Sequence, residues 1–145
     1  MTNINVDVDA NELVETPTMP DGTVVTFQVS GEPEIKESNS NPGTHYLNIS
    51  LDVIEAAKPE YIGLSVFHMI SIPSTKMKKR MLDKNKAKGW KFICSNWAIF
   101  CKILKMDKAN FNTQRAIGKK FKGSVTIEEY DGRVSNKVAH ILDAS

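Results

Sequence analysis

Residues 76–106 constrain the fold most, because the second half of this segment carries apolar residues at helical spacing. Positions 93, 97, 100, 101 and 104 fall on one face of a helix with 3.6 residues per turn. We therefore expect one helix there, ending near Asp107. The sequence before this segment and after Phe121 instead alternates in the manner of β-strands. The chain is thus expected to be mainly β, with a single helix between strands.

Five strands are predicted from the alternation of apolar and polar residues and from the turn residues between them. The second strand is the clearest, since Leu47, Ile49, Leu51 and Val53 all point to one side. Asp131-Gly132 predicts a tight hairpin between the last two strands. The predicted strands span residues 23–31, with an extension across a bulge at Gly31 into 34–36, then 44–54, 61–72, 119–130 and 133–142.

The phase of the other strands predicts which side chains face the core. In the third strand, it places Tyr61, Phe67 and Met69 on the side opposite Val66 and Ile70. In the fifth strand, Val134, Val138 and Leu142 share one face. The residues expected to point inward in the first and fourth strands are Val25, Phe27, Val29, Phe121, Val125 and Ile127.

Five strands with one helix between the third and the fourth is the element order of an OB-fold, a small Greek-key barrel. The broad apolar face of the helix suits a plug at one end of such a barrel. A split β-sandwich with a lid helix is the alternative. Residues 1–19 are acidic and hold too few apolar residues for a core element, so we expect a flexible arm there and the OB-fold domain in residues 20–145.

A length of 145 residues suits one domain large enough to bury a core. No apolar run approaches the roughly 20 residues of a membrane span, and no signal peptide is visible. Cys94 and Cys101 lie two helical turns apart, about 10 Å, which exceeds the reach of about 7 Å between the α-carbons of a disulfide. We therefore expect free thiols, no membrane association and a cytoplasmic location.

The net charge of +2 conceals a strong asymmetry between the two halves of the chain. Residues 1–60 hold eleven acidic and two basic residues, for a net charge of −9, whereas residues 61–145 hold six acidic and seventeen basic residues, for a net charge of +11. Eight of the sixteen positions in 76–91 are basic, and we expect this run to be a loop before the helix. It is compatible with binding a polyanion, with pairing to the acidic half, or with simple solvation.

No motif in the sequence indicates catalysis, a cofactor or a metal site. His68 and His140 are isolated on strands and are expected to be ordinary core or edge residues. The carboxylates Glu128, Glu129 and Asp131 are clustered, but they lie at a predicted hairpin tip that is expected to be solvated. No glycine-rich phosphate loop or serine nucleophile motif is present. We therefore expect a binding protein that is not an enzyme and needs no cofactor.

Proteins that bind single-stranded nucleic acid without sequence preference combine a cationic groove with aromatic side chains on which bases stack. Candidate stacking residues are Tyr46, Tyr61 and Phe67 on the second and third strands, and Trp90 within the basic run. Packing in the core or over an edge is the alternative role for each, and for Phe67 it is the favoured one. The candidate phosphate-binding residues are Lys76, Lys78, Lys79, Arg80, Lys84, Lys86, Lys88, Arg115, Lys119, Lys120, Lys122, Arg133 and Lys137.

The order and spacing of several short motifs resemble a known family. The motifs are Pro20-Asp21-Gly22-Thr23, Gly43-Thr44-His45-Tyr46-Leu47, Trp90 with the following helix, Ala116-Ile117-Gly118-Lys119-Lys120-Phe121, Tyr130-Asp131-Gly132 and Ser135-Asn136-Lys137-Val138. Over about residues 20–142, this layout is similar to the small OB-fold single-stranded DNA-binding proteins of bacteriophage replication and recombination gene clusters. The resemblance implies sequence-independent coating of single-stranded DNA during replication, recombination or repair, in a host cytoplasm, with replication or recombination proteins as further partners.

The chain departs from that family in the position of its acidic segment. Many such proteins end in an acidic tail that recruits partners, whereas here the acidic segment is N-terminal and the sequence ends Leu142-Asp143-Ala144-Ser145. Two roles are open for the acidic arm: folding over the basic groove in competition with DNA, or holding a partner. The alternatives to DNA binding are an RNA-binding OB module and a non-enzymatic interaction module for an acidic partner. The sequence leaves the oligomeric state open.

Overall fold

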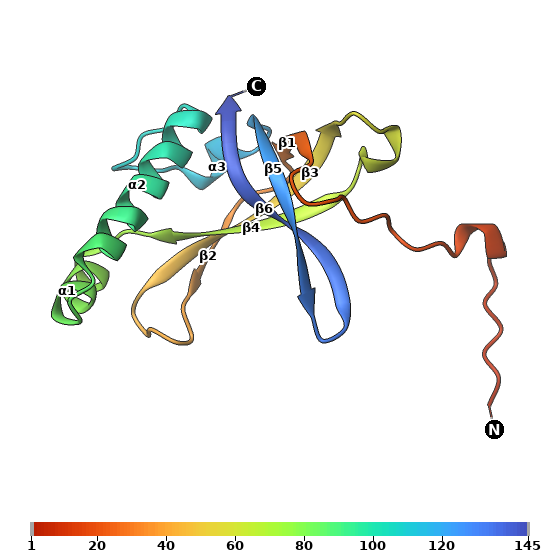
Figure 1. Ribbon diagram of the computed structural model, residues 1–145, viewed down its shortest axis with the longest axis horizontal. Helices are drawn as coiled ribbons and strands as arrows, with labels where there is room; N and C mark the ends of the chain where they lie inside the picture. Colours follow the sequence, from red (N-terminus) through yellow and green to blue (C-terminus); the bar gives the residue numbers. More distant parts are fainter. Residues whose placement is uncertain (1, 145) are drawn as a thin grey trace.

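The computed structural model describes residues 2–144 and is mainly β (Figure 1). The strands are β1 (Val24–Val29), β2 (Glu34–Glu37), β3 (His45–Glu55), β4 (Ser65–Ile72), β5 (Lys120–Tyr130) and β6 (Arg133–Ala144). The α-helices are α1 (Thr75–Asp83), α2 (Ala87–Leu104) and α3 (Thr113–Ala116), and short 3-10 helices η1 and η2 span Ala10–Glu12 and Pro59–Tyr61. No helix in residues 2–144 is long and apolar enough to cross a membrane.

The strands form one mixed sheet in the order β1-β5-β6-β4-β3-β2, and β1 also pairs with β3. This extra pairing closes a ring of hydrogen-bonded strands through β1, β5, β6, β4 and β3, which leaves β2 outside the ring as an edge strand. All pairings are antiparallel except β4 with β6, which meet in parallel at the single pair Phe67 and Lys137. The predicted mainly β class is confirmed, and the five ring strands follow the predicted order along the chain.

The core lies between the strands of this ring and α2, which packs against β4, β5 and β6. The inward phase predicted for β1 and β3 is confirmed, since all the named side chains of these strands are buried. Phe27 of β1 and Phe121 of β5 pack with ring centroids 5.6 Å apart. Gly123 lies beneath the Phe27 ring, where an added β-carbon would come within 3.0 Å of the ring. The helix residues that complete the core are Trp97, Phe100, Cys101 and Leu104.

The prediction of a single helix preceded by a basic loop is wrong, because most of the basic run is helical. Ser74 caps α1 by accepting a hydrogen bond from the Met77 N–H on its Oγ, at 3.2 Å. Lysine and arginine are good helix formers, so the run needs little apolar surface to be helical. Asn85 turns the chain with a φ of 58° between α1 and α2, and the two helices pack as a hairpin.

Three details of the predicted strands are also wrong. Residues 34–37 form the separate strand β2 and do not continue β1, and the third strand begins at Ser65 because Pro59–Tyr61 forms a 3-10 helix. Ile127 is exposed, as are Val134 and Leu142. The β5–β6 pair shifts register twice, and its outer half projects beyond the rest of the sheet (Figure 1). The alternation of apolar and polar residues therefore does not predict which side chains are buried in this pair. The Asp131-Gly132 turn is as predicted, with both residues at positive φ.

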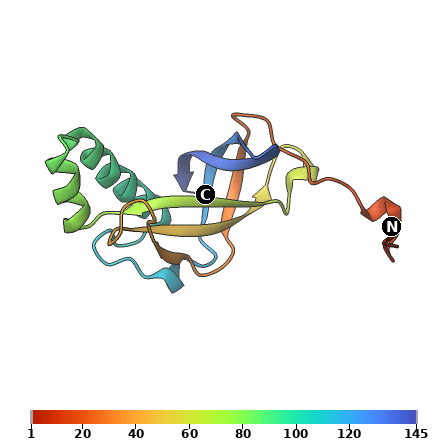
Figure 2. The same cartoon turned by 90° about the horizontal axis from the view of Figure 1, so that it is seen from below.

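The N-terminal arm leaves the domain at the end opposite α1 and α2 (Figures 1 and 2). Every side chain in residues 2–18 is exposed, whereas Met19 is completely buried in the core. The carboxylate of Asp21 accepts hydrogen bonds from the Ile127 N–H at 2.6 Å and from the Thr126 hydroxyl at 2.9 Å. These contacts, the backbone bond from Ile127 most of all, lower the pKa of Asp21. Because Met19 is buried and residues 2–18 are exposed, the folded domain begins at Met19.

Candidate nucleic-acid interface

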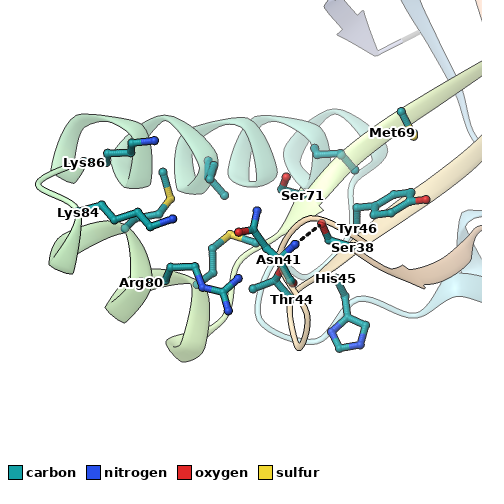
Figure 3. Close-up of a pocket in the computed structure, with 14 residues that line it drawn as sticks. Ser38, Asn41, Thr44, His45, Tyr46, Met69, Ser71, Arg80, Lys84 and Lys86 are labelled. Carbon is teal, nitrogen blue, oxygen red and sulfur yellow. Dashed lines mark hydrogen bonds between the residues drawn. The ribbon is translucent and has the colours of Figure 1, made fainter.

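An open groove of about 490 Å³ lies between the α1–α2 hairpin, the loop that joins β2 to β3, and the outer faces of β3 and β4 (Figure 3). We call it the Tyr46 groove. Arg80, Lys84 and Lys86 project from the helical hairpin, and Tyr46 and Met69 come from the sheet. The remaining lining residues are Ser38, Asn41, Thr44, His45, Ile70, Ser71, Met77, Met81 and Ile93.

The strand phase explains why Tyr46 faces this groove. Leu47 and the alternate residues after it are buried, so Tyr46 lies on the outer face of β3, where it is half-buried. It pairs with Lys36 of β2 on one side and with Ser71 of β4 on the other. The ring is therefore flanked by short or flexible side chains, which leaves it accessible from the groove.

The loop that forms one wall of the groove is internally hydrogen-bonded. The hydroxyl of the buried Thr44 donates to the Asn41 carbonyl at 2.6 Å, and the Ser38 N–H donates to the Thr44 carbonyl at 2.9 Å. Gly43 has a φ of +86°, and the side chain of Lys76 lies directly against it, where a β-carbon would otherwise be. The positive φ favours glycine at this position, and the internal hydrogen bonds hold the loop in one conformation.

The cations of the groove come from one face of α1 and from the turn after it. Met77, Arg80, Met81 and Lys84 follow the helical spacing i, i+3, i+4, i+7 and all line the groove. Arg80 donates from Nη2 to the Pro42 carbonyl at 3.3 Å, which holds the helix against the loop. The basic side of the groove is thus formed by α1, which lies in the segment that was expected to be a loop.

The charges of the helical hairpin form no ion pair with any side chain of residues 2–142. Among the side chains described, those of residues 2–142, the ion pair formed is between Lys36 Nζ and Glu34 Oε2, 3.6 Å apart. Pairing of the acidic half with the basic half, one of the alternatives open on sequence, therefore does not occur through ion pairs. The basic hairpin keeps its positive potential available for an external anion.

Two large side chains extend this surface along β4. Phe67 is 59% exposed and Met69 is 66% exposed, so the core-packing interpretation of Phe67 is wrong. Phe67 pairs with Ser50 of β3 and with Lys137 of β6, which places a cation on the neighbouring strand. Met69 lines the Tyr46 groove, so the exposed apolar pair Phe67 and Met69 leads into the groove over two steps, about 7 Å of strand.

The structure does not bring all the predicted binding residues together. Tyr61 is buried at 6% exposure, so its predicted outward position is wrong and its ring is not available for stacking. Trp90 is half-buried on α2 and does not line the groove. Lys120 and Lys122 lie on β5, which is not adjacent to β3 or β4 in the ring. The remaining predicted cations, exposed or partly exposed away from the groove lining, are Lys78, Lys79, Lys88, Arg115, Lys119 and Arg133.

The groove also contains residues that the sequence did not single out. Asn41, Ser38 and Ser71 add polar groups that can hydrogen bond to sugars or base edges. The Ser-Asn-Ser-Asn-Pro-Gly composition of the loop indicated a turn but not its position beside a helix. The signal that could have revealed the site is Ser74 as an N-cap, followed by Met77 and Met81 four residues apart.

A second groove, also of about 490 Å³, lies between β4, β6 and α2. The ring of His68 is partly covered by Phe100, with 6.4 Å between centroids, and burial lowers the pKa of His68. Cys94 and Cys101 are free thiols, and burial, followed by the charge of Asp107, raises the pKa of Cys101 to about 11. Over the side chains of residues 2–142, no group of three or more His, Cys, Asp or Glu residues could hold a metal ion.

The Tyr46 groove therefore offers fixed cations, an aromatic face, exposed sulfur and apolar surface, and neutral hydrogen-bonding groups. That combination suits an elongated anion with flat apolar parts better than a compact metal ion or a buried small molecule. A scan against protein-family models found no match, and a search of curated proteins found no similar sequence.

Proposed function

We propose that this chain is a non-enzymatic protein that binds single-stranded DNA without sequence specificity. The observation that carries the proposal is the convergence of Tyr46 and Met69 with Arg80, Lys84 and Lys86 in one open groove. A partly exposed aromatic beside several uncompensated cations is the combination on which single-stranded nucleic acid binds. A coating role during replication, recombination or repair follows from the resemblance of the sequence to phage proteins of that kind.

The arrangement of strands supports assignment of the fold to the OB type. In an OB-fold, the second and third strands of the barrel and the loop between the first and second carry the ligand. In this chain, the second and third ring strands are β3 and β4, and the loop between β2 and β3 belongs to the connection between the first and second ring strands. The Tyr46 groove lies on these same elements.

The proposed mechanism has two separable parts. The cations Arg80, Lys84 and Lys86 neutralise phosphates and release their counterions, which makes affinity fall with salt. The faces of Tyr46 and Phe67 stack on bases, at about 1–3 kcal/mol per base, and tolerate any base because every base has a π-face. A single strand is favoured over a duplex because only unpaired bases present these faces.

Competition binding tests the proposal. A labelled dT oligonucleotide is bound by the full chain and challenged with unlabelled single-stranded DNA, duplex DNA, single-stranded RNA or heparin. Single-stranded DNA should compete best, and log affinity against log salt should slope at roughly −3 to −4 if four to six phosphates are contacted. Stronger competition by RNA would identify an RNA-binding module instead. Equal competition by all four would identify a general site for acidic partners.

A further inference from the structure

The groove between β4, β6 and α2 is largely apolar and adjoins the Tyr46 groove, since Met69, Ile70, Ser71 and Ile93 line both. We call it the Phe92 groove. Phe92 is 66% exposed and Ile99 is 47% exposed, and with Asn96 they form one row on the outer face of α2. Beyond Phe67 and Lys137, β4 and β6 make no further pairs in residues 2–144, and the separated strands form the opposite wall. A helix face of this kind normally has a partner.

The N-terminal arm has the complementary character. Ile4, Val6 and Val8 are 86%, 59% and 50% exposed and alternate with Asn5, Asp7 and Asp9. This period of two gives an extended chain one apolar side and one polar, acidic side. The arm contains no basic residue, and its apolar side chains touch nothing in the same copy that would bury them. It is therefore a strand-like segment without a partner.

We propose that residues 4–8 of one copy dock in the Phe92 groove of a second copy. The lengths agree, because the four steps from Ile4 to Val8 span about 13 Å of extended chain and the seven residues from Phe92 to Ile99 span about 10 Å of helix. The charges agree as well. Lys88 lies four residues before Phe92, and Lys102 lies three residues after Ile99, so both flank the apolar row on the helix surface and face the arm's acids.

The direction of the arm favours a second copy over the same copy. Met19 is fixed in the core, and the arm leaves the domain away from α2 (Figure 2). The residues that precede Pro17 and Pro20 are held extended, which carries the arm outward. From Val8 to Met19, eleven steps of chain reach at most about 36 Å, so the docking residues can lie well outside their own domain.

Such a contact joins two different surfaces and is therefore head-to-tail. Contacts of this type continue into rings or open chains of copies and do not stop at a two-fold dimer. The contact goes beyond the proposed function. The two grooves share lining residues, but Arg80, Lys84 and Lys86 line the Tyr46 groove and not the Phe92 groove. If the chain does coat DNA, the contact supplies cooperativity along the strand.

Cross-linking between two variants that each carry one accessible cysteine tests the contact without DNA. Both variants carry Cys94→Ser, and Cys101 stays because it is buried and its raised pKa keeps it protonated. One variant adds Val6→Cys and the other adds Asn96→Cys, and they are mixed under mild oxidation. A mixed dimer should form several-fold faster than with Asn5→Cys, the matched control on the opposite phase of the arm. Equal rates for the two arm positions would overturn the proposal.

A chain with both Val6→Cys and Asn96→Cys distinguishes docking of the arm in a second copy from docking of the arm in its own copy. Under dilution, it should remain reduced if the arm binds a second copy, and rapid closure within one chain would overturn that assignment. Sedimentation of the full chain gives an independent measurement, in which Val6→Asp should lower self-association while the melting temperature stays unchanged. Affinity for an oligonucleotide that fits one copy should also stay unchanged. If only the affinity for this oligonucleotide is lost, the result argues against the proposed function and not against docking of the arm.

Discussion

The side-chain amide of Asn136 hydrogen bonds to both backbone groups of Met19. The Met19 N–H donates to Asn136 Oδ1 at 2.8 Å, and Asn136 Nδ2 donates to the Met19 carbonyl at 2.8 Å. The same Nδ2 also donates to the Thr126 carbonyl at 3.3 Å. One side chain of β6 thus ties the entry of the arm to β5 and fixes where the folded domain begins.

This junction predicts a sharp boundary in stability. Met19→Ala should lower the free energy of unfolding by about 2–5 kcal/mol, because it empties a fully buried site. Asn136→Ala should cost about 1–3 kcal/mol, since it leaves partly buried backbone groups unpaired. Deletion of residues 2–18, which keeps Met19, should leave stability nearly unchanged. Chemical denaturation measures all three, and a large loss on deletion would show that the arm contributes to folding.

Phe67 and Tyr61 provide a second contrast, since the sequence placed both on one outward face. Phe67→Ala should weaken oligonucleotide binding about 5- to 150-fold, which corresponds to a stacking contribution of 1–3 kcal/mol. Its effect on unfolding should stay within about 0.5 kcal/mol because the ring is mostly exposed. Tyr61→Ala should do the reverse and lose about 3–5 kcal/mol of stability, as other buried aromatics do. Equal destabilisation by both variants would contradict the assigned exposures.

The parts of the fold that could be predicted from sequence are those where apolar periodicity reports burial directly. The alternation from Leu47 to Val53 gave the inward face of β3, and the spacing of Trp97, Phe100 and Leu104 gave the core face of α2. The Asp131-Gly132 turn was predictable because its backbone requires positive φ at both residues. In each case, one physical constraint acts on neighbours in sequence.

The parts that were missed depend on contacts between distant segments. The apolar stripe of α1 consists of little more than Met77 and Met81, so its helical character is hidden among lysines. The groove exists only because that helix packs beside the β2–β3 loop, which no local pattern encodes. Tyr61 was misplaced because Pro59 and the positive φ of Gly63 turn the chain before β4 begins.

Tyr46 and Lys84 should affect binding in different ways. Tyr46→Ala should reduce affinity about 5- to 150-fold at fixed salt and barely change the salt slope, since stacking involves no phosphate. Lys84→Ala should lower the magnitude of the slope by about 0.7, the value for one phosphate on a single strand. Lys79→Ala is the matched control, because Lys79 lies on the same helix but outside the groove lining. An equal slope change for Lys79 and Lys84 would place the phosphates elsewhere.

The burial of His68 predicts a pH dependence of stability. Burial disfavours the charged imidazolium, so the pKa of His68 lies below its ordinary value of 6.5 in the folded state. Between that lowered pKa and about 6.5, the unfolded chain binds more protons, so the free energy of unfolding should fall as pH falls through this window. His68→Gln should remove this part of the dependence, which urea denaturation at pH 7.5 and at successive values down to 5 can measure.

Two other groups allow this assignment to be checked. His140 lines the same groove but is exposed, so His140→Gln should leave the decline in stability below pH 6.5 intact. Asp21 also has a lowered pKa, from its hydrogen bonds to Ile127 and Thr126, so its stabilising effect is present above its ordinary value of 3.8 and is lost at more acidic pH. Asp21→Asn should therefore lower stability by a constant amount above about pH 4 and remove its decline at more acidic pH, leaving the slope in the His68 window unchanged. If His68→Gln retains the full decline between pH 6.5 and 5, the buried imidazole is not its source.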